Sequence, residues 1–236
     1  MPSGSETVPR KTYSSRKTIQ IAAAVGMVVG ALLTRPIFRP WLLAHISGLK
    51  MDRFALASLA PWMAFSLYWE IAAKNSAPIV KSESKASRLV HVVLTNVALL
   101  LIIAPIRPLS QRLLPDAVTV KLLGLGLECA GLALAIWARR VLGRNWSGEI
   151  TIKENHELVR TGPYATVRHP IYTALLAMYV GTAIVFGQMH ALIGLVIGMI
   201  AYLRKTRMEE VNLVNAFGQR YDDYRKETWA IVPGIY

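Results

Sequence analysis

Long apolar runs separated by short polar segments dominate this chain of 236 residues. The runs cover residues 18–33, 54–73, 89–104, 118–138 and 171–203. A helix needs roughly 20 apolar residues to cross the hydrocarbon core of a bilayer. The last run is too long for one crossing and is interrupted at residues 187–190, so it predicts a tight helical hairpin.

This pattern predicts an all-α integral membrane protein, a bundle of five to six transmembrane helices. The run at 18–33 follows basic residues, as a signal peptide would, but no small-residue cleavage site follows it. We therefore expect a retained first span. Six spans result if every run crosses, and five if the first run or one hairpin arm does not. The expected division is a polar basic tail at 1–17, transmembrane helices 1–4 at 18–142, and a C-terminal module at 143–236.

The charged residues support the membrane interpretation and orient it. Lys and Arg number 27 against 14 Asp and Glu, giving a net charge of +13, and they lie between the apolar runs. Such flanking positions are typical of membrane anchors rather than of a nucleic-acid-binding face. The segments 74–88 and 139–168 share the more basic side with both termini, so we expect that side to be cytoplasmic. The predicted partner is the lipid bilayer, with no nucleic acid.

Several other features favour structural roles. Cys129 is the only cysteine, and the five histidines show no metal-ligand spacing, so no metal site is expected. Gly124 and Gly126 lie in an apolar run, where glycine allows close helix packing. Glu128 in the same run is a functional candidate because a carboxylate inside a membrane is costly. The sequence gives it no partner, and its role stays unassigned.

Two polar stretches, residues 143–170 and 204–236, flank the predicted hairpin. The first is rich in Gly, Pro and charged residues, and such irregular backbone does not lie exposed to lipid. The second is charged and aromatic, and we expect a helix in it up to about Phe217. If the hairpin folds back on itself, both stretches meet at its cytoplasmic mouth. The chemistry of the protein should be sought there.

The segment 156–172 reads HELVRTGPYATVRHPIY and carries several physical signals. Gly162-Pro163 predicts a turn, and Pro170 suits the first turn of a helix. Free backbone N–H groups at that helix start would bind a carboxylate, helped by Arg168 or His169. A His-Pro pair before a helix is by itself typical of an ordinary helix start. The combination is more informative than any single part.

This segment resembles the signature of the isoprenylcysteine carboxyl methyltransferase family. The preceding run 144–147 is similar to a lead-in found in bacterial relatives. The similarity resumes in the C-terminal stretch and covers residues 143–233 in all, whereas the earlier spans match only as hydrophobic segments. The resuming positions are Glu209, Glu210, Leu213, Phe217, Gly218, Tyr221, Tyr224, Ile231, Val232 and Pro233.

The resemblance implies a site for S-adenosylmethionine, built without a Rossmann domain, in a catalytic module at 143–236. It implies that residues 156–159 line the adenosine, that Tyr164 packs beside the cofactor, and that His169 and Tyr172 hold its methionine end with Glu209. The implied cofactor-binding residues are Glu149, His156, Glu157, Leu158, Val159, Tyr164, His169, Pro170, Ile171, Tyr172 and Glu209.

The implied substrate is a lipophilic or prenylated molecule that enters from the bilayer. The family keeps an arginine four residues before the glutamate pair, and here Lys205 stands at that position beside Arg204. Lysine keeps the charge but not the fork that binds a carboxylate with two hydrogen bonds. We expect Lys205, Arg204 and Glu209 to be catalytic. A carboxylate acceptor is already ionised near neutral pH and needs no general base. The expected location is a bacterial inner membrane, with the active site facing the cytoplasm.

Three alternatives remain open from the sequence. The acceptor is an amine of a phospholipid headgroup or a thiol, in which case a base is needed and Glu209 or Glu210 could serve. A membrane sterol reductase that binds a nicotinamide cofactor would have a longer chain with more spans. A transporter would show internal repeats with broken helices, and no internal repeat is present.

Overall fold

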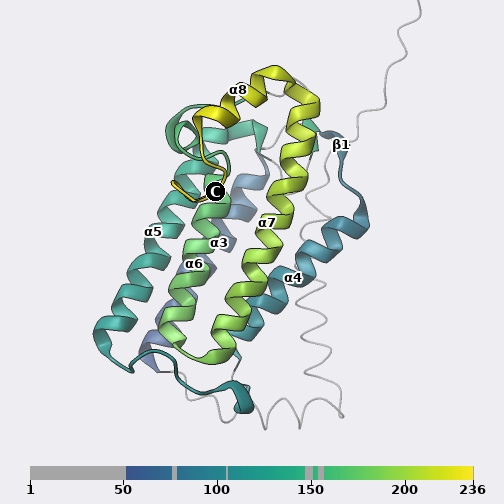
Figure 1. Cartoon of the computed structure of the whole chain (residues 1–236). Coiled ribbons are helices and arrows are strands. Elements are labelled where there is room, and N and C mark those ends of the chain that lie inside the picture. The colour runs from purple at the N-terminus through teal and green to yellow at the C-terminus, as the bar shows by residue number, and fades with distance from the viewer. Residues whose placement is uncertain (1–51, 76–78, 105, 147–150, 154–156, 236) are drawn as a thin grey trace, which may run out of the picture.

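The computed structural model describes residues 52–75, 79–104, 106–146, 151–153 and 157–235. Figure 1 shows a bundle of long helices with a short helix lying across one end. The helices are α3 (Arg53–Ala73), α4 (Lys85–Ile103), α5 (Val118–Leu142), α6 (Pro170–Phe186), α7 (Met189–Phe217) and the short α8 (Gln219–Glu227). The tail at 1–17 and the expected first span at 18–33 lie outside the described residues.

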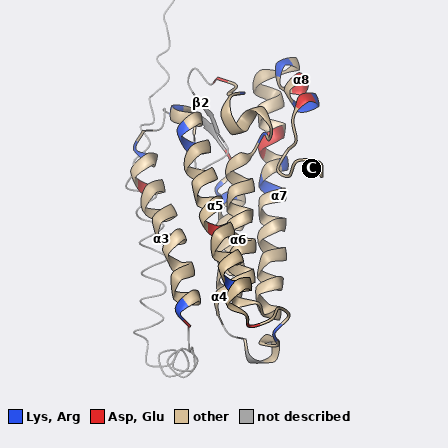
Figure 2. Cartoon of the chain, turned by 90° about the vertical axis from the view of Figure 1, so that its left-hand side faces the viewer, with Lys and Arg blue, Asp and Glu red and all other residues tan. Residues whose placement is uncertain are grey.

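The bundle has the surface of an integral membrane protein. Within the described ranges, α4, α5 and α7 are long and apolar enough to cross a membrane, and α6 is a shorter apolar helix. Large apolar side chains face outward along the helices, with Leu67 65% and Leu123 71% exposed. Lys, Arg, Asp and Glu gather mainly at the two ends of the bundle (Figure 2). The prediction of a helical membrane bundle is confirmed.

The predicted hairpin is formed by α6 and α7. Gly187 ends α6 with a positive φ of 63°, a conformation that glycine adopts without a steric penalty, and Gln188 precedes α7. Helix α7 then continues through the polar residues after the apolar run and ends at Phe217, as expected. The hairpin therefore returns the chain to the end of the bundle where α6 begins.

Helices α5 and α6 approach closely through small residues. A Cβ atom added to Gly131 would lie 2.7 Å from the carbonyl oxygen of Ala174, and one added to Gly124 would lie 2.7 Å from that of Gly181. Contacts this short exclude any larger side chain at the crossing. Gly126, in contrast, faces open space. The packing role expected for Gly124 is thus present, whereas Gly126 does not share it.

Glu128 joins three helices in the interior. Its side chain is fully buried, and the Ser58 hydroxyl of α3 donates a hydrogen bond of 2.5 Å to its Oε1 atom. Beside it, the Trp62 indole N–H donates to Thr182 Oγ1 of α6 at 2.9 Å. This polar cluster in an apolar interior connects α3, α5 and α6. Glu128 therefore takes part in the contacts that hold these helices together.

The polar segments that follow α3 and α5 meet at one end of the bundle. Arg139, buried at the end of α5, donates to the carbonyl oxygens of Gly143 at 2.6 Å and of Ala72 at 2.5 Å. A two-stranded antiparallel sheet, which the sequence pattern did not predict, pairs β1 (Ile79–Ser82) with β2 (Thr151–Lys153). These contacts bring the segments that follow α3 and α5 together beside the end of α7.

Candidate functional site

The candidate site begins where α6 starts. Pro170 is the first residue of α6, and η3 (Gly162–Ala165) forms the predicted turn before it. The N–H groups of Tyr172 and Thr173 donate to the carbonyl oxygen of His169, and proline has none. Of the backbone N–H groups predicted to bind an anion at this helix start, only that of Ile171 is therefore left to do so.

The C-terminal segment of the chain holds this helix start in place. The N–H groups of Arg168 and His169 donate to the carbonyl oxygens of Trp229 at 2.8 Å and Ala230 at 3.0 Å. The Trp229 N–H donates in return to Thr166 at 3.1 Å. Segments about 60 residues apart thus pair through the backbone, which fixes the direction in which the His169 side chain points.

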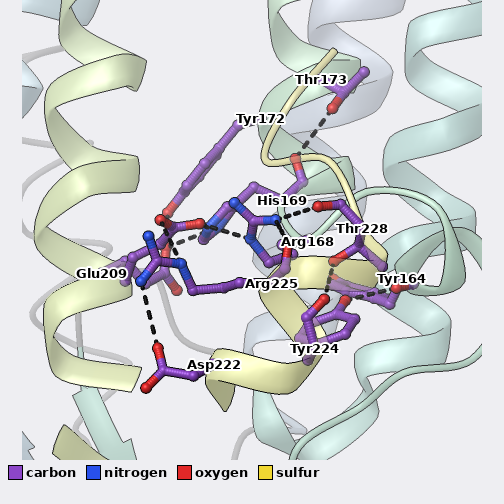
Figure 3. Close-up of polar contacts among 11 residues, drawn as sticks. Tyr164, Arg168, His169, Tyr172, Thr173, Glu209, Asp222, Tyr224, Arg225 and Thr228 are labelled. Atoms are coloured by element: carbon purple, nitrogen blue, oxygen red, sulfur yellow. Dashed lines mark hydrogen bonds and ion pairs between the residues drawn. The ribbon is translucent and has the colours of Figure 1, made fainter. Parts of the chain in front are cut away.

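His169, Tyr172 and Glu209 form a contiguous group, shown in Figure 3. The His169 and Tyr172 rings stack with centroids 5.5 Å apart and an interplanar angle of 6°. The Tyr172 hydroxyl donates to Glu209 Oε2 at 2.7 Å, and His169 Nδ1 lies 3.6 Å from the same oxygen. The predicted partners at the start of α6 and on α7 are therefore brought together.

Glu210 has a different environment from its neighbour. Arg168 Nε donates to Glu210 Oε1 at 2.7 Å, and both side chains are nearly buried, at 9% and 11% exposed. Arg225 Nε of α8 lies 3.8 Å from the other carboxylate oxygen of Glu210. Arg168 also donates to the carbonyl oxygens of Thr228 and Arg225. Glu210 and Arg168 consequently connect α7, the start of α6 and the C-terminal segment.

A cavity of about 460 Å³ opens beside this group. Its lining includes many of the residues singled out from the sequence: Glu157, Leu158, Val159, Tyr164, His169, Ile171, Tyr172, Lys205 and Glu209. Pro170 is buried at the helix start, and Arg204 donates to Ser87 Oγ of α4 at 3.1 Å; neither lines the cavity. Glu149 and His156 lie outside the described residues.

Helix α7 presents one continuous face to the cavity. Tyr202, Lys205, Glu209, Leu213 and Phe217 follow one another at helical spacing and all line it. The Lys205 ammonium lies 5.8 Å from the centroid of the Tyr172 ring. A cation and a carboxylate therefore stand one turn apart on the same wall, with Tyr172 in contact with both.

The tyrosines beside the motif are held neutral by their surroundings. Burial raises the pKa of Tyr164 well above its ordinary value, and burial raises the pKa of Tyr224 to about 12. The Tyr224 hydroxyl donates to the carbonyl oxygen of Tyr164 at 2.6 Å. Both hydroxyl groups therefore stay protonated near neutral pH, and that of Tyr224 acts as a hydrogen-bond donor.

Part of the lining was not identified from the sequence. Helix α3 contributes Phe65 and Trp69, and α4 contributes Arg88, His91 and Thr95. One signal was available: the polar residues of α4 recur at intervals of three and four in an otherwise apolar helix, which places them on one face. The apolar run alone did not show that this face lines a cavity.

The fold and the cavity define a helical integral membrane protein whose polar site lies at one end of the bundle. Residues 123–215 match the sequence model of the Isoprenylcysteine carboxyl methyltransferase (ICMT) family. This range includes the motif at 156–172 and the glutamate pair at 209–210. The resemblance inferred from those residues is confirmed over this region of the chain.

Known proteins of related sequence match between a third and a half of the chain. The Protein-S-isoprenylcysteine O-methyltransferase of Schizosaccharomyces pombe is 34% identical over 115 residues, covering 47% of this chain and 48% of that protein. The protein of the same name from Dictyostelium discoideum is 31% identical over 85 residues, 36% of each chain. The matches thus span less than half the length of these relatives.

A solved structure of the eukaryotic intramembrane Ras methyltransferase ICMT aligns with 79% of this chain and 55% of its own, at 19% identity and a TM-score of 0.43. A likeness this distant carries no argument about function, which has to rest on the site itself.

Proposed function

We propose that this protein is a membrane-embedded, S-adenosylmethionine-dependent methyltransferase that acts on the carboxylate of a lipophilic acceptor. The observation that carries the proposal is that the motif before α6 and the charged face of α7 line one cavity. The family match over residues 123–215 and the names of the relatives support the same activity.

The residues that line the cavity fit this cofactor. Two carboxylates, Glu157 and Glu209, can accept hydrogen bonds from an ammonium group, and aromatic side chains offer flat faces to an adenine ring. The Tyr221 hydroxyl is buried at the cavity without a hydrogen-bond partner. The volume of about 460 Å³ lies within the range of small-molecule sites, about 300–1,000 Å³.

Each residue then has a specific task. Bound in this cavity, S-adenosylmethionine would supply a methyl group on a positively charged sulfur, which an ionised carboxylate accepts without first losing a proton. Leu158 and Val159 line the adenosine, and His169 and Glu209 hold the methionine end. The Tyr172 hydroxyl fixes the Glu209 carboxylate through its hydrogen bond. The main contribution of the protein is to align the reacting groups and to exclude water.

The acceptor occupies the part of the cavity nearer α3 and α4. Lys205 lines the cavity and positions the carboxylate; Arg204, which contacts Ser87, stands behind it on the same helix. Phe65 and Trp69 of α3 supply an apolar wall for a lipid-like tail that enters from the bilayer. Residues 143–236 thus form the cofactor side of a catalytic module, and α3 and α4 complete it.

The cavity end of the bundle faces the cytoplasm in this proposal. The polar segments that meet there carry most of the Lys and Arg residues between spans, and such segments stay on the cytoplasmic side. Asn145 and Trp146 belong to the lead-in that is similar to bacterial relatives, so the setting we propose is a bacterial inner membrane.

Adjacent glutamates provide a matched test of the cofactor site. The full chain in lipid nanodiscs is titrated with S-adenosylmethionine by calorimetry, and the melting temperature is recorded. Glu209→Gln should weaken binding by roughly tenfold or more without lowering the melting temperature, because a charged hydrogen bond to the ligand is lost. Glu210→Gln should instead lower the melting temperature, because Arg168 loses a buried carboxylate partner.

His169→Ala should weaken cofactor binding, and Arg140→Ala, a change at an exposed position of α5, should not. Wild-type protein that binds no S-adenosylmethionine, or a His169→Ala variant with unchanged affinity, would overturn the proposal. Methyl transfer is then assayed against lipophilic acids, amines and thiols. Transfer to amines or thiols alone would keep the cofactor assignment and reject the carboxylate acceptor.

A further inference from the structure

The cavity ends inside the bundle, at one level of the helices that line it. In the described part of the chain, one cavity-lining residue on each of four helices lies farthest from the polar end: Phe65 on α3, Thr95 on α4, Leu175 on α6 and Tyr202 on α7. Each helix continues beyond that residue without lining the cavity. The next layer of side chains therefore forms the floor of the cavity.

Tyr179 of α6 lies at the centre of this floor. It follows Leu175 by one helical turn, and its side chain is buried. Its hydroxyl donates to the carbonyl oxygen of Thr95 at 2.9 Å. Its ring meets the Tyr202 ring with centroids 6.1 Å apart and an interplanar angle of 74°. Tyr179 therefore contacts the deepest lining residues of α4 and α7.

Trp62 of α3 and Gly198 of α7 complete the floor. The Trp62 ring lies one turn beyond Phe65, and its edge meets the Tyr179 ring with centroids 5.2 Å apart and an interplanar angle of 89°. Gly198 leaves room for the same ring, because a Cβ atom there would lie 3.1 Å from Tyr179 Cδ1. Helices α3, α4 and α7 thus all contact Tyr179.

Hydrogen bonds fix both aromatic side chains of the floor in an otherwise apolar interior. The Trp62 indole N–H donates to Thr182 Oγ1 at 2.9 Å, and the Tyr179 hydroxyl is bound to α4. Phenylalanine would fill almost the same space as tyrosine without a polar atom. Polar groups inside a membrane are costly and are typically retained for a function. Here the hydrogen bonds give the floor a fixed position.

A fixed floor is suited to limiting the length of an apolar tail. A tail in a bilayer is already out of water, so additional carbon atoms gain little by entering an apolar pocket. A tail that is too long for a closely packed pocket is instead rejected by overpacking. Lys205, the proposed partner of the acceptor head, lies one turn from Tyr202 on the polar side. A tail that extends from that head into the bundle therefore reaches Tyr179.

We propose that Tyr179 sets the maximum tail length of the acceptor. The tail lies along Phe65 and Leu175, and its end rests on the Tyr179 ring. This inference rests on the proposed function and adds a specificity-determining residue inside the membrane, outside the motif at 156–172. It narrows the substrate class to acceptors whose tail ends within the bundle, and it excludes longer tails.

A photoreactive group at the end of the tail locates the floor directly. A prenylated N-acylcysteine with a diazirine at the tip of its tail is bound to the full chain in nanodiscs and irradiated, and the labelled residue is identified by mass spectrometry. We expect the label on Tyr179 or Trp62. Label on Leu67, which is 65% exposed on the outer surface of α3, or on lipid alone would overturn the inference.

A series of acceptors with one to four isoprene units in the tail tests the length limit. In the wild type, kcat/KM should fall by roughly tenfold to a hundredfold at one step of the series, as expected for overpacking. Tyr179→Ala should move this step to a tail longer by about one isoprene unit, because the missing ring leaves space. Tyr179→Phe keeps the ring and should keep the step where it is.

Met178→Ala is the matched control for lost packing. Met178 is buried on the same turn of α6 but faces α5, since a Cβ atom added to Gly131 would lie 2.8 Å from its Cγ atom. Met178→Ala should lower the melting temperature as Tyr179→Ala does, without moving the length limit. A limit that moves equally in both variants would assign the effect to general loosening of the bundle and would overturn the inference.

Equal kcat/KM for all tail lengths in the wild type would also overturn it, as would the same limit in wild type and Tyr179→Ala. If Tyr179→Ala does not fold, the position of the photochemical label on the wild type decides alone. Failure of the proposed function gives a different result: the diazirine would still label Tyr179, but no methyl group would be transferred to an acceptor of any tail length.

Discussion

At the scale of single residues, the motif before α6 is held by contacts from the C-terminal end of the chain. Thr173 Oγ1 donates to the carbonyl oxygen of Ile231 at 2.6 Å, and the Tyr224 hydroxyl donates to that of Tyr164 at 2.6 Å. Arg168 and Glu210 add a nearly buried ion pair. Two of these supporting residues, Arg168 and Tyr224, also line the cavity, whereas Thr173 and Glu210 do not.

Tyr224→Phe tests this support and carries a pH dependence. Loss of its hydrogen bond should reduce the free energy of unfolding by about 1 kcal/mol near neutral pH. Burial raises the folded-state pKa from 10.0 to about 12, so the folded state keeps a proton that the unfolded state releases. Stability from this group is present below pH 10 and is lost as the pH rises toward 12.

The measurement is thermal unfolding in detergent between pH 7 and pH 11. The Phe variant should begin with a lower melting temperature and then lose less of it than the wild type as the pH rises. Parallel curves for the two proteins would contradict the assignment of a raised pKa to this buried hydroxyl.

The sequence singled out the residues of the motif and of α7 because their types and order form a pattern. His169, Tyr172 and Glu209 lie on two segments that the predicted hairpin brings together, and the structure places them in contact. His91 and Arg88 were not identified, because a helix read only as an apolar run does not reveal which of its faces lines a cavity. Their spacing becomes informative once α4 is placed beside α7.

At the scale of elements, α5 and α6 depend on backbone approach at two glycines. Gly131→Ala should destabilise the protein by about 1–3 kcal/mol, because the new Cβ would lie 2.7 Å from the backbone oxygen of Ala174 and the helices would have to separate. Gly126→Ala is the matched control on the same helix, where a Cβ meets open space. It should leave stability unchanged or raise it by up to about 1 kcal/mol.

Thermal unfolding of both glycine variants in the same detergent compares them directly. A Gly131→Ala variant as stable as Gly126→Ala would show that the two helices are not in backbone contact at this crossing.

The end of α5 offers a second paired comparison. Arg139→Met should lower the free energy of unfolding by about 1–3 kcal/mol, because the carbonyl oxygens of Gly143 and Ala72 lose a buried donor. The neighbouring Arg140 is exposed, and Arg140→Met should have little effect. Chemical denaturation in mixed micelles is the measurement, and equal stability of the two variants would contradict the proposed connection between α5 and α3.

Elements differed in how well the sequence predicted them. The hairpin turn followed from Gly187 and Gln188 within an apolar run, because a local signal marks it. The pairing of β1 with β2 joins segments about 70 residues apart, and Trp229 pairs with Thr166 through the backbone alone. No local pattern marks such contacts, since backbone groups are the same at every residue.

At the scale of the whole molecule, the cavity is lined by both the N-terminal helices and the C-terminal part of the described chain. Residues from α6, α7 and the motif before α6 line one side, and residues from α3 and α4 line the other. The family match covers residues 123–215, so it includes the first set except Phe217 and none of the second. We therefore expect cofactor binding to follow the matched region and acceptor choice to depend on α3 and α4.

The chemical form of the product shows whether the methyl group is transferred to a carboxylate. Purified full chain in nanodiscs is incubated with methyl-labelled S-adenosylmethionine and a prenylated N-acylcysteine, and the lipid product is treated with alkali. We expect a labelled product that releases its label as volatile methanol, as a methyl ester does, and that is not formed by Glu209→Gln. Label that stays on the lipid after alkali, or no labelled lipid at all, would contradict methyl transfer to a carboxylate.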